Sequence, residues 1–107
     1  MLNTSVAGIG GCERYRSLFE QYEDWSSEIA LTICSMESGG VANASNWKDS
    51  HEGCNGSFGL MQIGCLHGVS REDLYDPATN IRVAHELWKT NGFNPWTTYH
   101  KLLAYDR

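Results

Sequence analysis

The sequence predicts a mainly α-helical domain with a short irregular or β-hairpin segment in its middle. Apolar residues recur at helical spacing on both sides of that segment. The segment itself, residues 41–59, is rich in Asn, Ser, Asp and Gly, which is typical of an exposed loop. A length of 107 residues corresponds to one compact domain. We therefore expect a single domain over residues 1–107, with residues 1–11 flexible or weakly ordered.

Two helices are expected before the middle segment. The first covers residues 12–23, where the residues at helical spacing are Tyr15, Leu18, Phe19 and Tyr22. The second covers residues 25–38, with Asp24 as its N-cap and an apolar stripe made of Trp25, Ile29, Ile33 and Met36. Gly39 and Gly40 are expected to end this helix, because glycine readily adopts the left-handed conformation found after helix ends.

The second half of the chain predicts further helices. Residues 58–63 form a short apolar run between glycines, which is either a strand or the start of a buried helix. Ser70 is expected to cap a short helical turn. The dipeptide Asp76-Pro77 should start a longer helix that ends at Gly92, since Pro is favoured at the first helical position. A last helix is expected over residues 94–103.

Composition and charge exclude two classes of partner. The net charge is −5, and no cluster of Lys or Arg provides the basic surface that phosphate binding requires, so we expect no nucleic-acid partner. No segment approaches the roughly 20 apolar residues of a membrane span. Residues 1–11 also lack the charged start and apolar run of a signal peptide. We therefore expect no membrane partner, and either delivery by another component or origin within a longer protein.

The chain has four cysteines: Cys12, Cys34, Cys54 and Cys65. They allow three pairings, among which the sequence does not choose. An even number in a short chain indicates an oxidising destination, with buried free thiols as the alternative. A disulfide between Cys54 and Cys65 would close a loop around residues 57–63.

A zinc site is the competing interpretation of the same region. Its four ligands would be His51, Cys54, Cys65 and His67. The spacing is irregular, and the C-x-H half is too tight for common zinc folds. We therefore favour the disulfide and expect neither a metal nor another cofactor. The remaining helical histidine, His85, falls on the polar side of its helix and is expected to be solvated.

Glu37 is the main candidate for catalysis. It follows Ile33 and Cys34 by four and three residues, so it shares the apolar face of the helix over 25–38. Desolvation there and the negative end of the helix dipole should both raise the pKa of its carboxyl group. A carboxylic acid that stays protonated near neutral pH can protonate the leaving oxygen in glycosidic cleavage. The alternative is a glutamate whose side chain simply reaches solvent.

Four motifs carry a resemblance to a known family. Residues 37–40, ESGG, resemble the E-S-G signature that ends the catalytic helix of lytic transglycosylases and related phage lysozymes. Residues 57–63, SFGLMQI, resemble the signature S-x-G-L-M-Q-I, and residues 76–81, DPATNI, resemble D-P-x-x-N-I. Residues 93–99, FNPWTTY, are similar to the F-x-P-W-x-x-Y ending of small phage-type members. The ordered set covers roughly residues 25–100 and implies the lysozyme-like α-domain.

The resemblance also implies roles for individual residues. Glu37 would be the general acid and then the general base. The residues implied to contact substrate or the catalytic carboxyl group are Ser57, Met61, Gln62 and Tyr99. Ser57 and Gln62 would contact sugar or N-acetyl groups, Met61 would pack under the substrate, and Tyr99 would hydrogen-bond near the carboxyl group. A turn role for Ser57, and core packing for Met61 and Trp96, are the structural alternatives.

The third motif of the broader family, A-Y-N, is distorted here to Ala104-Tyr105-Asp106. Tyr105 therefore competes with Tyr99 for the position beside the carboxyl group, and we favour Tyr99.

The expected activity is cleavage of the β-1,4 link between N-acetylmuramic acid and N-acetylglucosamine in peptidoglycan. Glycosidases usually pair two carboxylates, whereas a lytic transglycosylase needs one acid, because the 6-hydroxyl of the substrate attacks and leaves a 1,6-anhydro end. Asp49 and Glu52 in the loop are the candidates for a second carboxylate in a hydrolytic lysozyme. We favour the transglycosylase.

The expected partners are therefore peptidoglycan glycan strands, bound by a monomer that acts at the bacterial cell wall, in the periplasm or outside the cell. A phage endolysin or a virion-associated enzyme fits this expectation. The interpretations from other classes are a non-catalytic wall-binding domain, the zinc-binding module described above, and an inhibitor built on the same fold.

Overall fold

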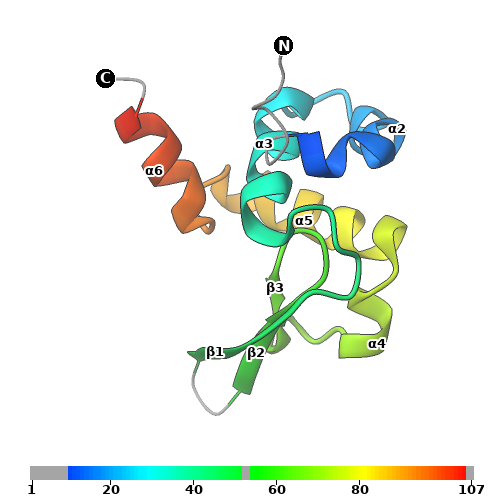
Figure 1. The fold of residues 1–107 in the computed structure, drawn as a ribbon, viewed down its shortest axis with the longest axis vertical. Helices are drawn as coiled ribbons and strands as arrows, with labels where there is room; N and C mark the ends of the chain where they lie inside the picture. Colours follow the sequence, from blue (N-terminus) through cyan, green and yellow to red (C-terminus); the bar gives the residue numbers. More distant parts are fainter. Residues whose placement is uncertain (1–9, 52–53, 106–107) are drawn as a thin grey trace.

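The structure is a computed structural model that describes residues 10–51 and 54–105, without the side chains of 49–51, 54, 66 and 105. It is mainly helical, with one small sheet on one side of the helices (Figure 1). The elements in chain order are η1 (Gly10–Tyr15), α2 (Arg16–Glu20), α3 (Ser27–Ser38), β1 (Ser45–His51), β2 (Cys54–Phe58), β3 (Ile63–Gly64), η2 (Cys65–His67), α4 (Arg71–Leu74), α5 (Pro77–Asn91) and α6 (Thr97–Tyr105). The predicted mainly α class is confirmed.

The N-terminal segment differs from the single helix expected over 12–23. It forms a 3-10 helix, η1, followed by the short helix α2, which ends at Glu20. Gly11 approaches the chain after α3 so closely that a Cβ on it would lie 2.5 Å from the Gly39 carbonyl oxygen. Gly10 and Gly11 therefore begin η1, contrary to the expected disorder of residues 1–11, while residues 1–9 lie outside the described chain.

Helix α3 ends where the sequence predicts but starts two residues later. Ser26 is its N-cap, and the Ser26 hydroxyl accepts a hydrogen bond from the Ile29 N–H. Asp24 does not cap the helix, because its carboxylate instead lies 2.7 Å from the ring nitrogen of His85. Gly39, with φ of +64°, terminates the helix as expected.

The middle of the chain forms a three-stranded antiparallel sheet in the order β1-β2-β3. The prediction of an exposed loop over 41–59 is wrong for β1 and β2, while the alternative of a hairpin is confirmed. The apolar run over 58–63 is divided: Phe58 ends β2, a turn follows, and Ile63 begins β3. Ser45 pairs with Phe58, and Ser57 pairs with Gly64.

The capping predictions in the second half hold. The Ser70 hydroxyl accepts a hydrogen bond from Asp73 N–H at the start of α4, and the Asp76 carboxylate accepts one from Thr79 N–H at the start of α5. Gly92 follows the end of α5. Helix α6 begins at Thr97 rather than 94, because the preceding residues form a turn.

His85 is buried, so the expectation of a solvated residue is wrong. The residue is 7% exposed and its ring stacks on Tyr22, with 4.1 Å between centroids. Its other aromatic neighbours are Trp25 and Trp88. The Asp24 carboxylate provides the hydrogen-bond partner that the buried His85 imidazole requires. This cluster packs the segment between α2 and α3 against α5.

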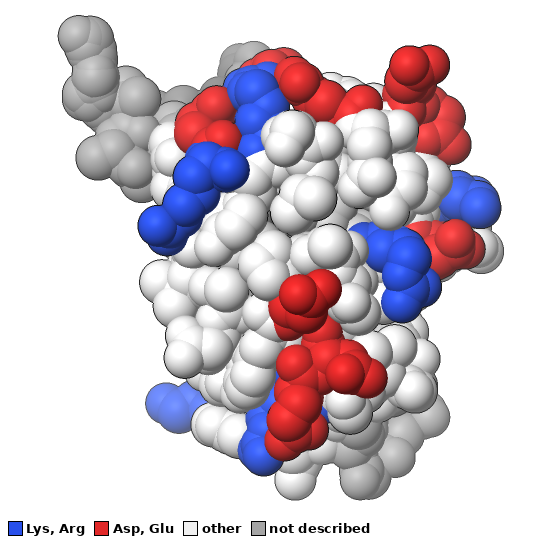
Figure 2. All heavy atoms as spheres, turned by 90° about the vertical axis from the view of Figure 1, so that its right-hand side faces the viewer, with Lys and Arg blue, Asp and Glu red and all other residues white. Residues whose placement is uncertain are grey.

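On the face drawn in Figure 2, basic and acidic side chains lie side by side along the upper and right-hand margins, and a further group of acidic side chains runs from the middle of the face toward its lower edge. Arg16 forms ion pairs with Glu13, Glu20 and Glu28. In the described part of the chain, no helix is both long enough and apolar enough to cross a membrane.

Candidate functional site

A cleft of about 360 Å³ lies where the end of α3 meets the sheet, η2, α5 and the turn before α6. The described residues that line it are Glu37, Ser57, Gln62, Ile63, Gly64, His67, Leu87, Pro95, Trp96 and Thr97. They come from six separate parts of the chain. Three of the five residues singled out in the sequence, Glu37, Ser57 and Gln62, therefore meet in one hollow.

Glu37 is the penultimate residue of α3 and is half-buried. Ile33 and Cys34, on the same helix face, are fully buried. The carboxyl group therefore lies at the border between the core and the cleft, as the helical spacing predicts. The Thr98 hydroxyl, from the first turn of α6, donates a hydrogen bond of 2.9 Å to Glu37 Oε2.

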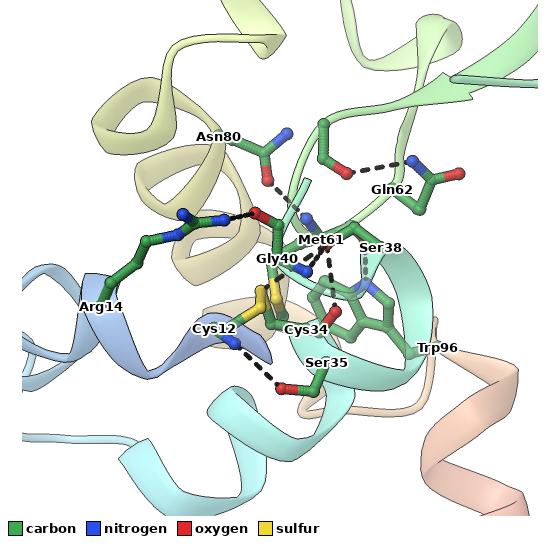
Figure 3. Close-up of a disulfide and its surroundings, with 11 residues drawn as sticks. Cys12, Arg14, Cys34, Ser35, Ser38, Gly40, Met61, Gln62, Asn80 and Trp96 are labelled. Carbon is green, nitrogen blue, oxygen red and sulfur yellow. Dashed lines mark hydrogen bonds between the residues drawn. A yellow bond between two sulfur atoms is a disulfide. The ribbon is translucent and has the colours of Figure 1, made fainter. Parts of the chain in front are cut away.

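The end of α3 is fixed from its other side by a disulfide between Cys12 and Cys34 (Figure 3). The Ser38 hydroxyl donates to the Cys34 carbonyl oxygen and accepts from Gly40 N–H. The Arg14 guanidinium donates to the Gly40 carbonyl oxygen at 2.9 Å. The backbone that carries Glu37 is thus held on both flanks, which limits the positions that its carboxyl group can take.

Ser57 lies on β2 and is 3% exposed, with its side chain on the cleft side of the sheet. Successive residues of a strand face opposite sides. Phe58 accordingly packs on the other side, where its ring lies 5.0 Å from that of Trp47. The placement of Ser57 therefore agrees with a cleft residue rather than a simple turn residue, because it lies within a paired strand.

Gln62 adopts a left-handed backbone conformation, with φ of +52°. Its Nε2 donates to the carbonyl oxygens of Ala44 and Gly59, at 3.2 and 3.0 Å. Both amide protons are therefore used to hold the turn.

Met61 does not have the place that the resemblance implies. Its side chain is fully buried in the core, so it does not form a surface under a substrate. Its backbone has a structural role: Met61 N–H donates to Asn80 Oδ1, and its carbonyl oxygen accepts from Trp96 Nε1 at 2.8 Å (Figure 3). Trp96 is 4% exposed, so it serves both the core and the cleft wall.

Tyr99 is half-buried and packs against the core, with its ring 5.5 Å from that of Phe93. It is not among the described lining residues, and the hydroxyl recorded beside Glu37 belongs to Thr98. The Tyr105 side chain lies outside the described residues. The motif over 93–99 thus leads to a segment that contacts Glu37, but its donor to Glu37 Oε2 is Thr98, one position before Tyr99.

His67 and Thr98 are the residues that sequence reasoning missed. His67 was considered only as a zinc ligand, yet it lines the cleft from η2. Its proximity to Glu37 depends on how η2 packs against the helices, which no local pattern indicates. Thr98 lies inside the motif over 93–99, so the sequence indicated the right segment. The resemblance, however, implies a role for Tyr99 and not for Thr98.

The zinc interpretation loses one of its ligands. Cys65 is disulfide-bonded, and a disulfide sulfur is not a thiolate ligand. Among the side chains that the structure describes, no group of three His, Cys, Asp or Glu is arranged to hold a metal ion. The side chains of His51 and Cys54 lie outside the described part, as do those of Asp49 and Glu52, the candidates for a second carboxylate.

Comparison of the chain with protein-family models, with curated proteins and with solved structures finds no match in any of the three.

Proposed function

We propose that the protein cleaves the β-1,4 bond between N-acetylmuramic acid and N-acetylglucosamine in bacterial peptidoglycan, with Glu37 as the general acid. The observation that carries this proposal is the meeting of Glu37 with Ser57 and Gln62 in one cleft. These residues belong to two separate motifs of the resemblance, and nothing in their local sequence requires them to be neighbours. The cell wall is accordingly the proposed place of action, and a phage or virion origin fits it.

The chemistry proposed for Glu37 has two steps. In the first, its protonated carboxyl group gives a proton to the glycosidic oxygen as the bond to the muramyl anomeric carbon breaks. In the second, the resulting carboxylate takes a proton from the muramyl 6-hydroxyl, whose oxygen bonds to the same carbon. The products are a free N-acetylglucosamine 4-hydroxyl and a 1,6-anhydromuramyl end, and Glu37 regains its proton.

Hydrolysis is the alternative outcome of the same first step, with water in place of the 6-hydroxyl. Retaining and inverting hydrolases both place a second carboxylate at a defined distance from the acid. Among the described residues that line the cleft, Glu37 is the one with a carboxyl group. The proposed reaction is the single-acid transglycosylation, so Asp49→Ala and Glu52→Ala are each expected to retain most activity.

The test is digestion of purified peptidoglycan by wild type and by Glu37→Gln, with mass spectrometry of the products. Glu37→Gln keeps the shape of the side chain but removes the transferable proton, so activity should fall by about 10²–10⁴-fold. The matched control is Glu23→Gln, because Glu23 is exposed and lies outside the cleft. Circular dichroism checks that each variant is folded.

Two results would count against the proposal. More than about a tenth of wild-type activity in folded Glu37→Gln would exclude Glu37 as the acid. Reducing-end muramyl products alone, with Asp49→Ala or Glu52→Ala as damaging as Glu37→Gln, would leave the substrate and Glu37 in place and would make the enzyme a hydrolytic lysozyme.

A further inference from the structure

The hydrogen bond from Thr98 to Glu37 joins two helices at the edge of the cleft. Thr98 Oγ1 donates to Glu37 Oε2 over 2.9 Å, and both side chains are half-buried. Thr98 lies in the first turn of α6, whereas Glu37 lies in the last turn of α3. The contact therefore depends on the tertiary packing of α6 against α3.

The position of Thr98 is itself fixed by the turn before α6. Trp96 Nε1 donates to the Met61 carbonyl oxygen at 2.8 Å, which ties this turn to the sheet. Tyr99 N–H donates to the Trp96 carbonyl oxygen, and the Tyr99 ring packs on Phe93. Thr98 is thus held between two anchored neighbours. Its β-branched side chain also has few rotamers available, so its hydroxyl has a defined direction.

We propose that Thr98 is a positioning residue for the Glu37 carboxyl group, because its hydroxyl holds Oε2 and so restrains the rotation of the group that donates the proton. This inference rests on the proposed function. A neutral carboxylic acid has one protonated oxygen and one acceptor oxygen. The Thr98 hydroxyl donates to Oε2, so this bond favours the arrangement in which Oε2 is the acceptor oxygen of the neutral acid. Rotation of the carboxyl group, which would exchange the two oxygens, costs this hydrogen bond.

The same hydrogen bond favours the ionised carboxylate over the neutral acid, since a donor stabilises negative charge. Removal of the hydroxyl should therefore make Glu37 harder to ionise and should also leave its carboxyl group less well oriented. Both effects are measurable separately. Other titratable groups lie near this bond. Among the described lining residues the other one is His67. Helix α6 also carries the exposed Lys101 and His100, and the His100 ring nitrogen lies 3.0 Å from the Asn94 carbonyl oxygen.

The test compares Thr98→Val, which is nearly isosteric and lacks the hydroxyl, with Thr98→Ser, which retains it. Thr90→Val is the matched control, because Thr90 is exposed on α5 and lies outside the cleft. The first measurement is the titration of the Glu37 side-chain carboxyl carbon by ¹³C NMR, assigned with Glu37→Gln. Glu37 in Thr98→Val should titrate about one pH unit higher than in wild type, and in Thr98→Ser close to wild type.

The second measurement is the pH profile of peptidoglycan cleavage. In Thr98→Val, kcat should fall by about 10-fold with KM within about two-fold, and the alkaline limb should move upward with the titration of Glu37. Thr98→Ser should keep kcat within about three-fold of wild type. The pH profiles are repeated in a His67→Gln background, so that the alkaline limb assigned to Glu37 is not confused with a contribution from His67.

Equal titration of Glu37 in wild type and Thr98→Val would overturn the proposal, as would an unchanged kcat. A loss of kcat in Thr98→Ser as large as in Thr98→Val would also overturn it, because the role would then depend on the methyl group. Since the NMR titration does not require activity, a shifted titration in a protein that cleaves no peptidoglycan would support the hydrogen bond and overturn the glycosidase assignment instead.

Discussion

Asn80→Ala should be one of the most destabilising single changes in this protein. The Asn80 side chain is fully buried on α5 and makes three hydrogen bonds to backbone groups. Its Oδ1 accepts from Met61 N–H at 2.8 Å, and its Nδ2 donates to the carbonyl oxygens of Phe58 and Leu74, each at 2.9 Å. Gly59 permits this approach, since a Cβ on it would lie 2.2 Å from Asn80 Nδ2.

The size of the expected loss in unfolding free energy follows from the three backbone groups that would lose their hydrogen bonds to Asn80. Each buried backbone group that loses its hydrogen bond costs about 1–3 kcal/mol. Water that enters the space left by the amide satisfies part of the deficit, so we expect a total of about 3–6 kcal/mol. The free energy of unfolding of a small domain is about 5–15 kcal/mol. Asn80→Ala should therefore remove a large fraction of the stability and loosen the turn that carries Gln62.

Equilibrium urea unfolding with intact disulfides, followed by tryptophan fluorescence, measures this loss. The matched control is Asn91→Ala, the same change at an exposed position of α5, which should cost less than about 0.5 kcal/mol. Asn80→Asp keeps an acceptor for Met61 N–H but directs negative charge at two carbonyl oxygens, so it should be at least as destabilising as Asn80→Ala. A cost for Asn80→Ala equal to that of Asn91→Ala would refute this reasoning.

Two further predictions concern the segments around α3. The double variant Cys12→Ser with Cys34→Ser should lose about 3 kcal/mol of unfolding free energy, because the disulfide spans 22 residues. Urea unfolding measures this loss, and an unchanged unfolding midpoint would contradict the prediction. The hydrogen bond from His85 lowers the pKa of Asp24, so the stabilisation that this carboxylate gives is present above about pH 4 and is lost as the pH falls through the lowered pKa. The stability difference between wild type and Asp24→Asn should therefore shrink between about pH 5 and pH 2, and a constant difference across thermal melts in this range would exclude the effect.

The parts of the fold that the sequence predicts well are those specified locally. Helix α3 ends at Gly39, and α5 begins at the dipeptide Asp76-Pro77, because a single residue type supplies the required conformation or hydrogen bond at each point. The start of α3 was misplaced, since both Asp24 and Ser26 suit an N-cap. In the structure Asp24 pairs with the distant His85, and Ser26 caps the helix.

The sheet could not be predicted in the same way. The residues of β1 are mostly polar, and their pairing with β2 depends on a partner strand and not on an alternating apolar pattern. Met61 illustrates the same limit at the site. Its motif marks the turn correctly, but whether the side chain faces the cleft or the core depends on the contacts of Asn80 and Trp96 with its backbone.

The candidate site was predictable in its membership more than in its geometry. Glu37, Ser57 and Gln62 could be named because each lies in a short motif, yet each is held in place by residues far along the chain. Near the end of α3, Cys34 forms a disulfide with Cys12, and Glu37 accepts a hydrogen bond from Thr98. Asn80 and Trp96 hold the turn before β3 through the Met61 backbone. A carboxyl group that must protonate one oxygen needs a fixed position relative to the groups that bind the sugar. In this chain that fixed relation comes from long-range backbone anchors, so we expect substitutions at Asn80 and Trp96, outside the proposed chemistry, to reduce kcat even in variants that remain folded.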